Sequence, residues 1–377
     1  MVFCVITEYR GIRFIAMIRD GIIEDLIPFY DDEKPKAGDI ILGKVSDKVP
    51  GIQSAFVNLG EIKAYLPISG DSGIKAQDEL PVLITKEASG NKEAVASSRL
   101  SLTGRYCVIQ QSKGKPVFRI SARITEPDER KRLEDGLKDI AEDFDIIIRT
   151  KAMDQDMDLI TDEIRSLMDK LSHIVEIAPS RTVYTRLYEA DMPYVTAIRD
   201  CRIGEVTKVI TDIPRVYNTI RERMPDVDIS LYEDKMLPLA KLHKIASTVD
   251  SVTERIVWLK SGAYIVIDET EAMTVIDVNS GRFSKDKSRE ESFYMINSEA
   301  VSEIARQLRI RNLSGIIMVD LINMKNRSDY DRLVDEMKQV FACDSQYTTF
   351  IDFTRLGLCE LTRKKVRRPL REVLNDA

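Results

Sequence analysis

The strongest constraint on the fold is a strand–helix–strand pattern in residues 273–324. Residues 273–278 and 316–319 are short runs rich in β-branched apolar side chains, as is typical of buried strands. Between them, residues 290–309 carry apolar side chains at helical spacing. Because such crossover connections are right-handed and join parallel strands, we expect both strands to end at the same edge of one sheet.

Two aspartates and an asparagine stand where these strands end. Asp277 lies at the end of the first strand and Asp320 directly after the second, and ligands of such sheets gather at the carboxyl ends of the strands. Asn279 shares the strand face of Asp277 because side chains repeat every second residue. Two carboxylates and an amide suit a hard cation such as Mg²⁺, which keeps room for water and a phosphate. The pattern therefore predicts a site for metal-assisted phosphodiester hydrolysis.

The alternative for these aspartates is purely local. An aspartate just past a strand often forms a turn or caps a helix, and for either residue alone that role is favoured. The pair on connected strands, with Asn279 beside it, gives the metal site and the local role similar weight.

The scarcity of histidine narrows the possible chemistry. The chain has 377 residues, enough for about two to four domains. Its two histidines, His173 and His243, lie in unrelated segments, and its five cysteines form no C-x-x-C pair. The sequence therefore does not contain the residues needed for a histidine metal cluster, a zinc signature, or a Ser-His or Cys-His nucleophile. The sequence also contains no glycine-rich phosphate loop, so an enzyme of this composition must rely on carboxylates and a metal.

Charge and hydropathy limit the partners and the compartment. The net charge of -6 excludes a uniformly basic nucleic-acid binder, but the 56 lysines and arginines leave cations for a local basic channel. No apolar run reaches the length of a membrane span and no signal peptide is evident, so we expect a cytoplasmic protein without a membrane span.

A basic run lies near the C-terminus. Such a run is either solvated or, close to the metal site, neutralises an RNA backbone. The run comprises Arg363, Lys364, Lys365, Arg367, Arg368 and Arg371.

Residues 39–102 show short alternating strands separated by turns, which indicates a small β-barrel. Phe56 and Tyr65 each lie on the face opposite the apolar side chains of their strand. Two aromatics on neighbouring strands can form a stacking platform for single-stranded bases, and Lys92 in a nearby loop can add a phosphate contact. The alternative, that an insert or adjoining domain covers both rings, stays equally open.

A further strand, residues 144–150, closes with Arg149 and Thr150 and is flanked by predicted helices at residues 136–144 and 157–176. A guanidinium beside a hydroxyl group is a reasonable grip for a phosphate. Many strands end in this dipeptide, however, and the residues alone favour a solvated surface pair.

Taken together, these residues resemble the ribonuclease E/G family of bacterial endoribonucleases. Weaker similarity extends over nearly the whole chain. The resemblance is strongest in AMTVIDVNSG at residues 272–281, in residues 297–309, in GIIMVD at residues 315–320 and in TRLGL at residues 354–358.

The resemblance implies a multidomain α/β fold. An RNase H-like domain, residues 1–35 and 192–252, would be interrupted by an OB-fold RNA-binding barrel at residues 36–100 and a 5′-sensor region at residues 101–191. A DNase I-like α/β catalytic domain would follow at residues 253–377.

The resemblance also implies roles for particular residues. Asp277 and Asp320 would hold Mg²⁺, and Asn279 would orient the neighbourhood of the metal or the scissile phosphate. RNA would contact three barrel residues, namely Phe56, Tyr65 (a phenylalanine in the family) and Lys92. A 5′-monophosphate would be held by Arg149 and Thr150, with Gly104 and Val108 lining the same pocket.

Three departures from the family pattern change these expectations. The chain reaches Ala377 without the C-P-x-C zinc link, so neither a zinc site nor a zinc-linked dimer is expected and the oligomeric state stays open. Asn323 stands where the family often has an aspartate, which removes a third carboxylate. Tyr347 aligns with an arginine that completes the 5′ pocket, so end sensing is expected to be weakened.

The resulting hypothesis is a Mg²⁺-dependent endoribonuclease that hydrolyses single-stranded RNA in rRNA processing or mRNA turnover, with 5′-monophosphate stimulation as a further expectation. One alternative is a non-catalytic RNA-binding member of the same family. A second is a metal-dependent DNA nuclease, because an acidic pair does not itself select the sugar.

Overall fold

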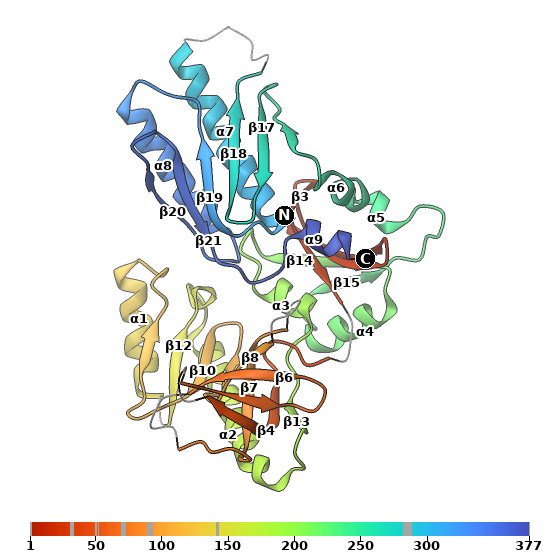
Figure 1. Cartoon of the computed structure of the whole chain (residues 1–377), viewed down its shortest axis with the longest axis vertical. Coiled ribbons are helices and arrows are strands. Elements are labelled where there is room, and N and C mark those ends of the chain that lie inside the picture. Colours follow the sequence, from red (N-terminus) through yellow and green to blue (C-terminus); the bar gives the residue numbers. More distant parts are fainter. Residues whose placement is uncertain are drawn as a thin grey trace. The chain divides into compact units, whose positions relative to one another are not determined.

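The computed structural model describes residues 2–30, 34–49, 51, 53–68, 73–88, 93–140, 143–281 and 289–376. The chain folds into two compact units (Figure 1). The first combines Met1–Asp31 with Pro193–Ala377, and the second is Asp32–Met192. Among the helices that the structure describes, none has the length and apolar character needed to cross a lipid bilayer.

The second unit contains a closed β-barrel. Side chains alternate along residues 55–58 and 63–67, so Ala55, Val57 and Leu66 fill the interior without measurable exposure. Pairing of the first and fourth barrel strands in the chain closes the ring, which confirms the small barrel predicted from the alternation and is compatible with an OB fold. In ring order the strands are β4 (Ile40–Val49), β5 (Ser54–Asn58), β6 (Lys63–Pro67), β8 (Ala94–Ser97) and β7 (Glu79–Lys86), and β13 (Arg186–Tyr188) pairs with β4 outside the ring.

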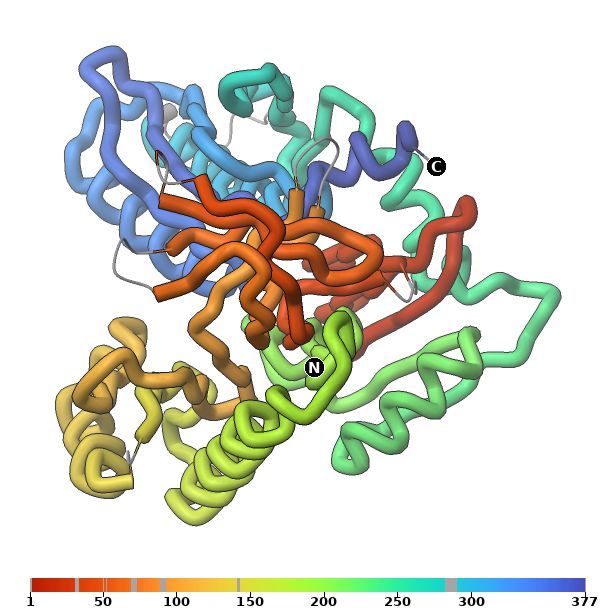
Figure 2. The backbone as a smooth tube through the Cα atoms, turned by 60° about the horizontal axis from the view of Figure 1, so that its bottom comes forward, coloured from red at the N-terminus to blue at the C-terminus, as the bar shows by residue number. Residues whose placement is uncertain are grey.

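A four-stranded sheet packed by helices completes this unit. Helix α2 (Met157–Ile177) is seen as one straight helix in Figure 2, and it buries Ile160, Ile164 and Leu171 at helical spacing against the sheet. The strand order is β11 (Phe118–Ile120), β12 (Phe144–Ile148), β10 (Cys107–Gln111) and β9 (Ser101–Thr103).

The helix predicted at residues 136–144 was misplaced. Helix α1 instead runs over Pro127–Leu137. Pro127 suits the first turn because its missing N–H needs no partner there, and Asp128 and Glu129 complement the helix dipole. Three short 3₁₀ helices follow in this unit, η2 (Lys138–Ile140), η3 (Thr150–Ala152) and η4 (Ala178–Ser180).

In the first unit, one sheet is built from two distant chain segments. Three antiparallel strands, β1 (Val2–Tyr9), β2 (Ile12–Arg19) and β3 (Ile22–Phe29), begin the chain. After the excursion through the second unit, β14 (Val206–Thr211) pairs parallel with β1 and β15 (Asp228–Leu231) with β14. The helices that accompany these segments are α3 (Pro193–Arg199), α4 (Pro214–Arg223), α5 (Leu239–Leu242), α6 (Ile245–Ser251) and α9 (Leu370–Asn375).

The second sheet of this unit has six strands and carries helices on one face. Helices α7 (Arg289–Arg311) and α8 (Arg327–Ala342) bury that face (Figure 1), where Ile276, Ile317 and Val319 lie in the core. In order the strands are β16 (Ile256–Trp258), β17 (Tyr264–Glu269), β18 (Met273–Asn279), β19 (Gly315–Asp320), β21 (Cys359–Arg363) and β20 (Thr348–Phe353).

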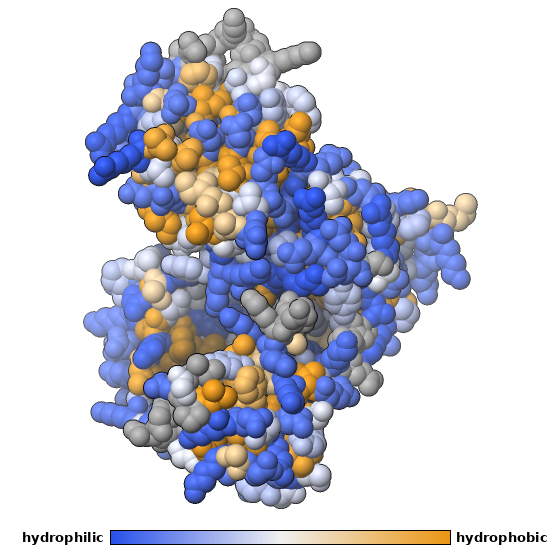
Figure 3. Space-filling view, viewed as in Figure 1, coloured by the Kyte–Doolittle hydropathy of each residue, from blue (hydrophilic) through white to orange (hydrophobic). Residues whose placement is uncertain are grey.

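The opposite face of this sheet is exposed and partly apolar. Met273, Val275 and Ile316 on β18 and β19 are 37%, 38% and 50% exposed, and Figure 3 shows hydrophobic residues gathered where Figure 1 draws these strands. Successive side chains of β18 and β19 point to opposite faces of the sheet, so one face lies in the core and the other is open.

Two members of the C-terminal basic run form ion pairs within the unit, and one of them is buried. Arg363 is 3% exposed in β21, and its Nε donates to Asp344 Oδ2 at 2.7 Å. Arg368 is half-buried and pairs with Glu372 and Asp376. At least these two cations therefore serve structure within the unit.

Candidate functional site

Asp277 and Asp320 lie side by side at the ends of β18 and β19. The two strands pair in parallel with these residues in direct register, and neighbouring strands are about 4.8 Å apart. The preceding residues Ile276 and Val319 point into the core, so both carboxylates face the open side and are exposed. The parallel pair predicted from the strand–helix–strand pattern is confirmed.

Asn279 lies on the same face and is hydrogen-bonded to Asp277. Its Nδ2 donates to Asp277 Oδ2 at 2.7 Å. The chain then turns at Gly281, whose φ is +54° and whose added Cβ would lie 2.3 Å from the carbonyl oxygen of Gly262. Only glycine tolerates both the left-handed conformation and this approach, so the turn after Asn279 is fixed by backbone contact.

The donor set at this edge fits Mg²⁺. Both carboxylates supply oxygen, which is the ligand atom that Mg²⁺ prefers, and Mg²⁺ sites commonly use one or two carboxylates with water and phosphate. In the part of the chain that the structure describes, no group of three or more His, Cys, Asp or Glu could hold a metal ion. At this edge, Asp277 and Asp320 would supply carboxylate oxygens to a cation. Asn323 is exposed in the loop after β19 and adds no charge.

The two barrel aromatics are neighbours, as their spacing predicted. Phe56 on β5 is in direct register with Tyr65 on β6, with ring centroids 6.1 Å apart and an interplanar angle of 69°. Both side chains are half-buried, and the hydroxyl groups of Tyr65 and Ser54 are hydrogen-bonded. The rings thus meet edge to face on the outer side of the barrel. Lys92 lies outside the described residues.

The four residues expected to hold a 5′-phosphate gather at one end of the four-stranded sheet. Arg149 follows β12, and its Nη1 donates to the carbonyl oxygen of Gly104. Strand β10 pairs with β12 so that Val108 is opposite Ile147. The Thr150 Oγ1 atom is 3.5 Å from Ser121 Oγ. Tyr347, in the other unit, is 60% exposed.

One residue at this end was missed by the sequence reasoning. Glu163 on α2 accepts hydrogen bonds from the backbone of the loop that contains Gly104. Burial, followed by the adjacent Glu163 carboxylate, raises the pKa of the Cys107 thiol well above its usual value, so this thiol stays neutral. No local sequence signal marks Glu163, because its partners lie more than 50 residues away in the chain.

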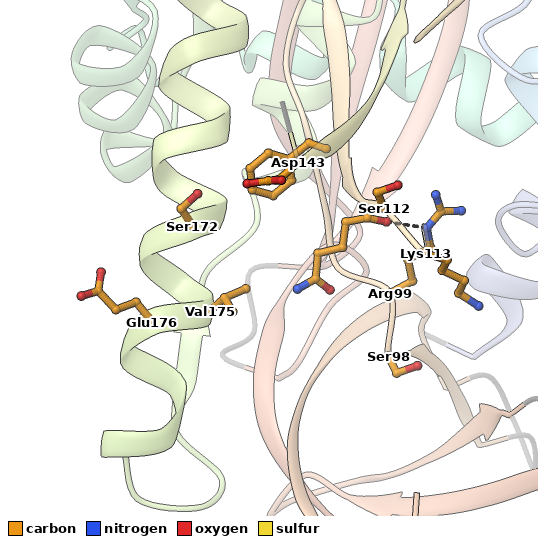
Figure 4. Close-up of a pocket in the computed structure, with 10 residues that line it drawn as sticks. Ser98, Arg99, Ser112, Lys113, Asp143, Ser172, Val175 and Glu176 are labelled. Carbon is orange, nitrogen blue, oxygen red and sulfur yellow. Dashed lines mark hydrogen bonds between the residues drawn. The ribbon is translucent and has the colours of Figure 1, made fainter. Parts of the chain in front are cut away.

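A separate pocket of about 570 Å³ lies at the opposite end of the same sheet (Figure 4). Arg99 in its lining already pairs with Asp145 and donates to the Gln111 carbonyl oxygen. No predicted site residue that the structure describes lines this pocket. Its other polar lining residues are Ser98, Gln111, Ser112, Lys113, Asp143, Ser172 and Glu176.

The fold and the site together define a mixed α/β protein with a closed barrel and an exposed acidic pair. The sequence model of the ribonuclease E/G family matches residues 101–366. The chain is 30% identical over 367 residues to ribonuclease E of Synechocystis sp., which covers 90% of this chain and 54% of that protein. It is 29% identical over 392 residues to ribonuclease G of Escherichia coli (strain K12), covering 96% of this chain and 79% of that protein.

The chain belongs to the ribonuclease E/G family, as the sequence resemblance predicted. It spans about half the length of the Synechocystis relative and a larger share of the Escherichia coli relative.

Proposed function

We propose that this protein is a Mg²⁺-dependent endoribonuclease that hydrolyses phosphodiester bonds of single-stranded RNA. The observation that carries the proposal is the register of Asp277 with Asp320 on adjacent parallel strands, with Asn279 bonded to Asp277. Family membership supports it, since relatives named ribonuclease E and ribonuclease G match most of the chain. The proposed setting is rRNA processing or mRNA turnover in the cytoplasm.

We further propose a division of labour among the domains. A DNase I-like domain, residues 253–377, would carry the chemistry, an OB-fold barrel at residues 36–100 would bind the strand, and residues 101–191 would sense the 5′ end. An RNase H-like domain of residues 1–35 and 192–252 would be the scaffold. The closed barrel and the sheet that the second unit interrupts support this division.

Asp277, Asn279 and Asp320, which we call the acidic edge, would act by binding the metal ion and orienting its ligands. Asp277 and Asp320 would hold Mg²⁺ through carboxylate oxygens, and the hydrogen bond from Asn279 would keep the Asp277 carboxylate in one orientation. When bound, the ion would activate water and offset the negative charge on the scissile phosphate. Because both carboxylates are exposed, an RNA phosphate can reach them. Holding the strand in place contributes alongside this chemistry.

Recognition of the 5′ end would depend on the second unit. Arg149 and Thr150 would bind a 5′-monophosphate beside Gly104 and Val108, since a guanidinium forms charge-assisted hydrogen bonds with phosphate oxygens.

A cleavage assay tests the proposed activity. We expect a single-stranded RNA oligonucleotide to be cleaved with Mg²⁺ and to remain intact with EDTA, because the carboxylates need a cation to act on a phosphate. The same RNA with a 5′-monophosphate should be cleaved faster than its 5′-hydroxyl form. Product lengths and rates are measured by gel electrophoresis of labelled RNA.

The contrary outcomes of this assay are distinct. RNA binding without cleavage at any Mg²⁺ concentration would identify a non-catalytic RNA-binding member of the family. Equal cleavage of a matched DNA oligonucleotide would identify a nuclease that does not select ribose. Cleavage that persists in EDTA would contradict the metal assignment.

Removal of a barrel ring should weaken RNA binding. We expect Phe56→Ala to raise the Kd for a single-stranded oligonucleotide roughly tenfold, because base–aromatic stacking contributes about 1–3 kcal/mol per base. Tyr65→Phe is the matched control, since it keeps the ring and removes only the hydroxyl that bonds Ser54. Fluorescence anisotropy measures both, and equal affinities for wild type and Phe56→Ala would rule out the stacking platform.

A further inference from the structure

Three consecutive backbone N–H groups converge on one side chain of α2. Tyr106 N and Cys107 N donate to Glu163 Oε1 at 2.7 and 3.1 Å, and Arg105 N donates to Glu163 Oε2 at 2.8 Å. Hydrogen bonds to an ionised carboxylate are about twice as strong as neutral ones. Residues 104–107, which we call the 104–107 loop, are therefore held by the Glu163 carboxylate.

Glycine at position 104 leaves the space that the Glu163 carboxylate occupies. A Cβ added there would lie 2.4 Å from Glu163 Oε1 and 2.5 Å from Glu163 Cδ. The loop is also closed on itself, since Gly104 N donates to the Cys107 carbonyl oxygen at 2.9 Å. The close contact shows that the loop and the carboxylate are packed as one unit.

The same loop holds Arg149 at two points. The Arg149 guanidinium donates through Nη1 to the Gly104 carbonyl oxygen, and Arg149 N donates to the Tyr106 carbonyl oxygen at 2.7 Å. The carbonyl and N–H groups of the loop thus contact different side chains. The N–H groups of residues 105–107 bind Glu163. The carbonyl groups of Gly104 and Tyr106 bind Arg149, the arginine that we assign to the 5′-phosphate.

We propose that Glu163 is a positioning residue for recognition of the RNA 5′-monophosphate, acting through the 104–107 loop to orient the Arg149 guanidinium. This inference rests on the proposed function of Arg149. Glu163 already occupies the N–H groups of Arg105, Tyr106 and Cys107, so a phosphate must be bound by the side chains of Arg149 and Thr150. The orientation of the guanidinium then decides the affinity for the 5′ end, because its hydrogen bonds to phosphate are directional.

Two substitutions separate positioning from folding. Glu163→Gln keeps the size of the side chain but replaces one acceptor oxygen by an NH₂ group, so at least one loop N–H loses its partner. Glu163→Ala removes all three hydrogen bonds. The matched control is Asp162→Asn, which removes one negative charge from the adjacent, exposed position of α2.

The measured quantity is the 5′-end preference, the ratio of kcat/KM for 5′-monophosphate RNA to that for 5′-hydroxyl RNA. In Glu163→Gln, the 5′-end preference is expected to fall roughly tenfold, which is the usual effect of losing a hydrogen bond to a charged group. If the wild-type preference is smaller than that, it should fall to one. Glu163→Ala should reach one, and Asp162→Asn should keep the wild-type preference. The matching ratio of Kd values, from fluorescence anisotropy, gives the same test in the absence of cleavage.

Three outcomes would overturn the inference. An unchanged preference in both Glu163 variants refutes it while leaving the proposed nuclease intact. Equal loss on both RNAs, with a lower Tm, assigns Glu163 a purely structural role. A wild-type protein that neither cleaves nor binds 5′-monophosphate RNA preferentially refutes the assignment of Arg149, and this inference with it, before any variant is made.

Discussion

Asp277→Asn is expected to lower the rate of RNA cleavage by about three orders of magnitude or more, because metal-ion catalysis supplies several kcal/mol and each 1.36 kcal/mol is a factor of ten. The substitution keeps the shape of the side chain and removes the charge that would hold Mg²⁺. RNA binding should change little, since the barrel belongs to the other unit. Single-turnover cleavage with saturating protein, alongside anisotropy binding, measures the two quantities separately.

The control for this variant is Asp268→Asn on the adjacent strand β17. Asp268 is in register with Val275, two residues before Asp277, and is paired with Arg255 at the surface. An exposed ion pair of this kind contributes little, so cleavage should stay near the wild-type rate. Normal cleavage by Asp277→Asn would exclude it as a metal ligand, and an equal loss in Asp268→Asn would show that the assay reports general surface charge.

The acidic edge was predictable from sequence because two short-range patterns agree there. The alternation of side chains along the first strand predicted that Asp277 and Asn279 share one face of the sheet. The helical crossover required that the two strands run parallel. The one-to-one register of Asp277 with Asp320 was beyond the sequence, because it depends on how the two strands slide against each other as the helix packs.

For the aromatic rings of Phe56 and Tyr65, too, the sequence predicted the face of the strand but not the geometry of the contact. Alternation placed Phe56 and Tyr65 on the outer side of their strands, and the structure brings them into register. Their edge-to-face contact and the hydrogen bond of Tyr65 with Ser54 depend on the rotamers of both rings, which no local pattern encodes.

Long-range polar partners escaped the sequence reasoning. Arg363 stands in a basic run, and such runs are usually solvated, but the alternation of β21 turns it into the interior. Its partner Asp344 is 19 residues away in the chain. Glu163 and its loop are farther apart still. A charge is assigned to the interior only when its partner is known, because burial of an unpaired charge is prohibitively costly.

The buried pair of Asp344 and Arg363 should therefore be critical for the stability of the unit that contains the acidic edge. Both side chains are 2% exposed. Asp344 accepts two hydrogen bonds from Arg363, at 2.7 and 3.2 Å, and one from Thr348 at 2.8 Å. Arg363 also donates to Asn312 and to the Leu313 carbonyl oxygen, between α7 and β19. The pair thus ties together the elements on either side of Asp320.

Asp344→Ala is expected to reduce the free energy of unfolding of this unit by about 3–5 kcal/mol, because removal of one partner leaves the other charge buried and unpaired. Urea denaturation followed by circular dichroism and by the fluorescence of Trp258 measures the change, since this single tryptophan belongs to β16 of the same sheet. The control is Asp335→Ala, which breaks the surface pair with Lys338 on α8 and should cost little. Similar midpoints for the two variants would mean that water reaches Arg363 and that the pair does not stabilise the sheet around Asp320.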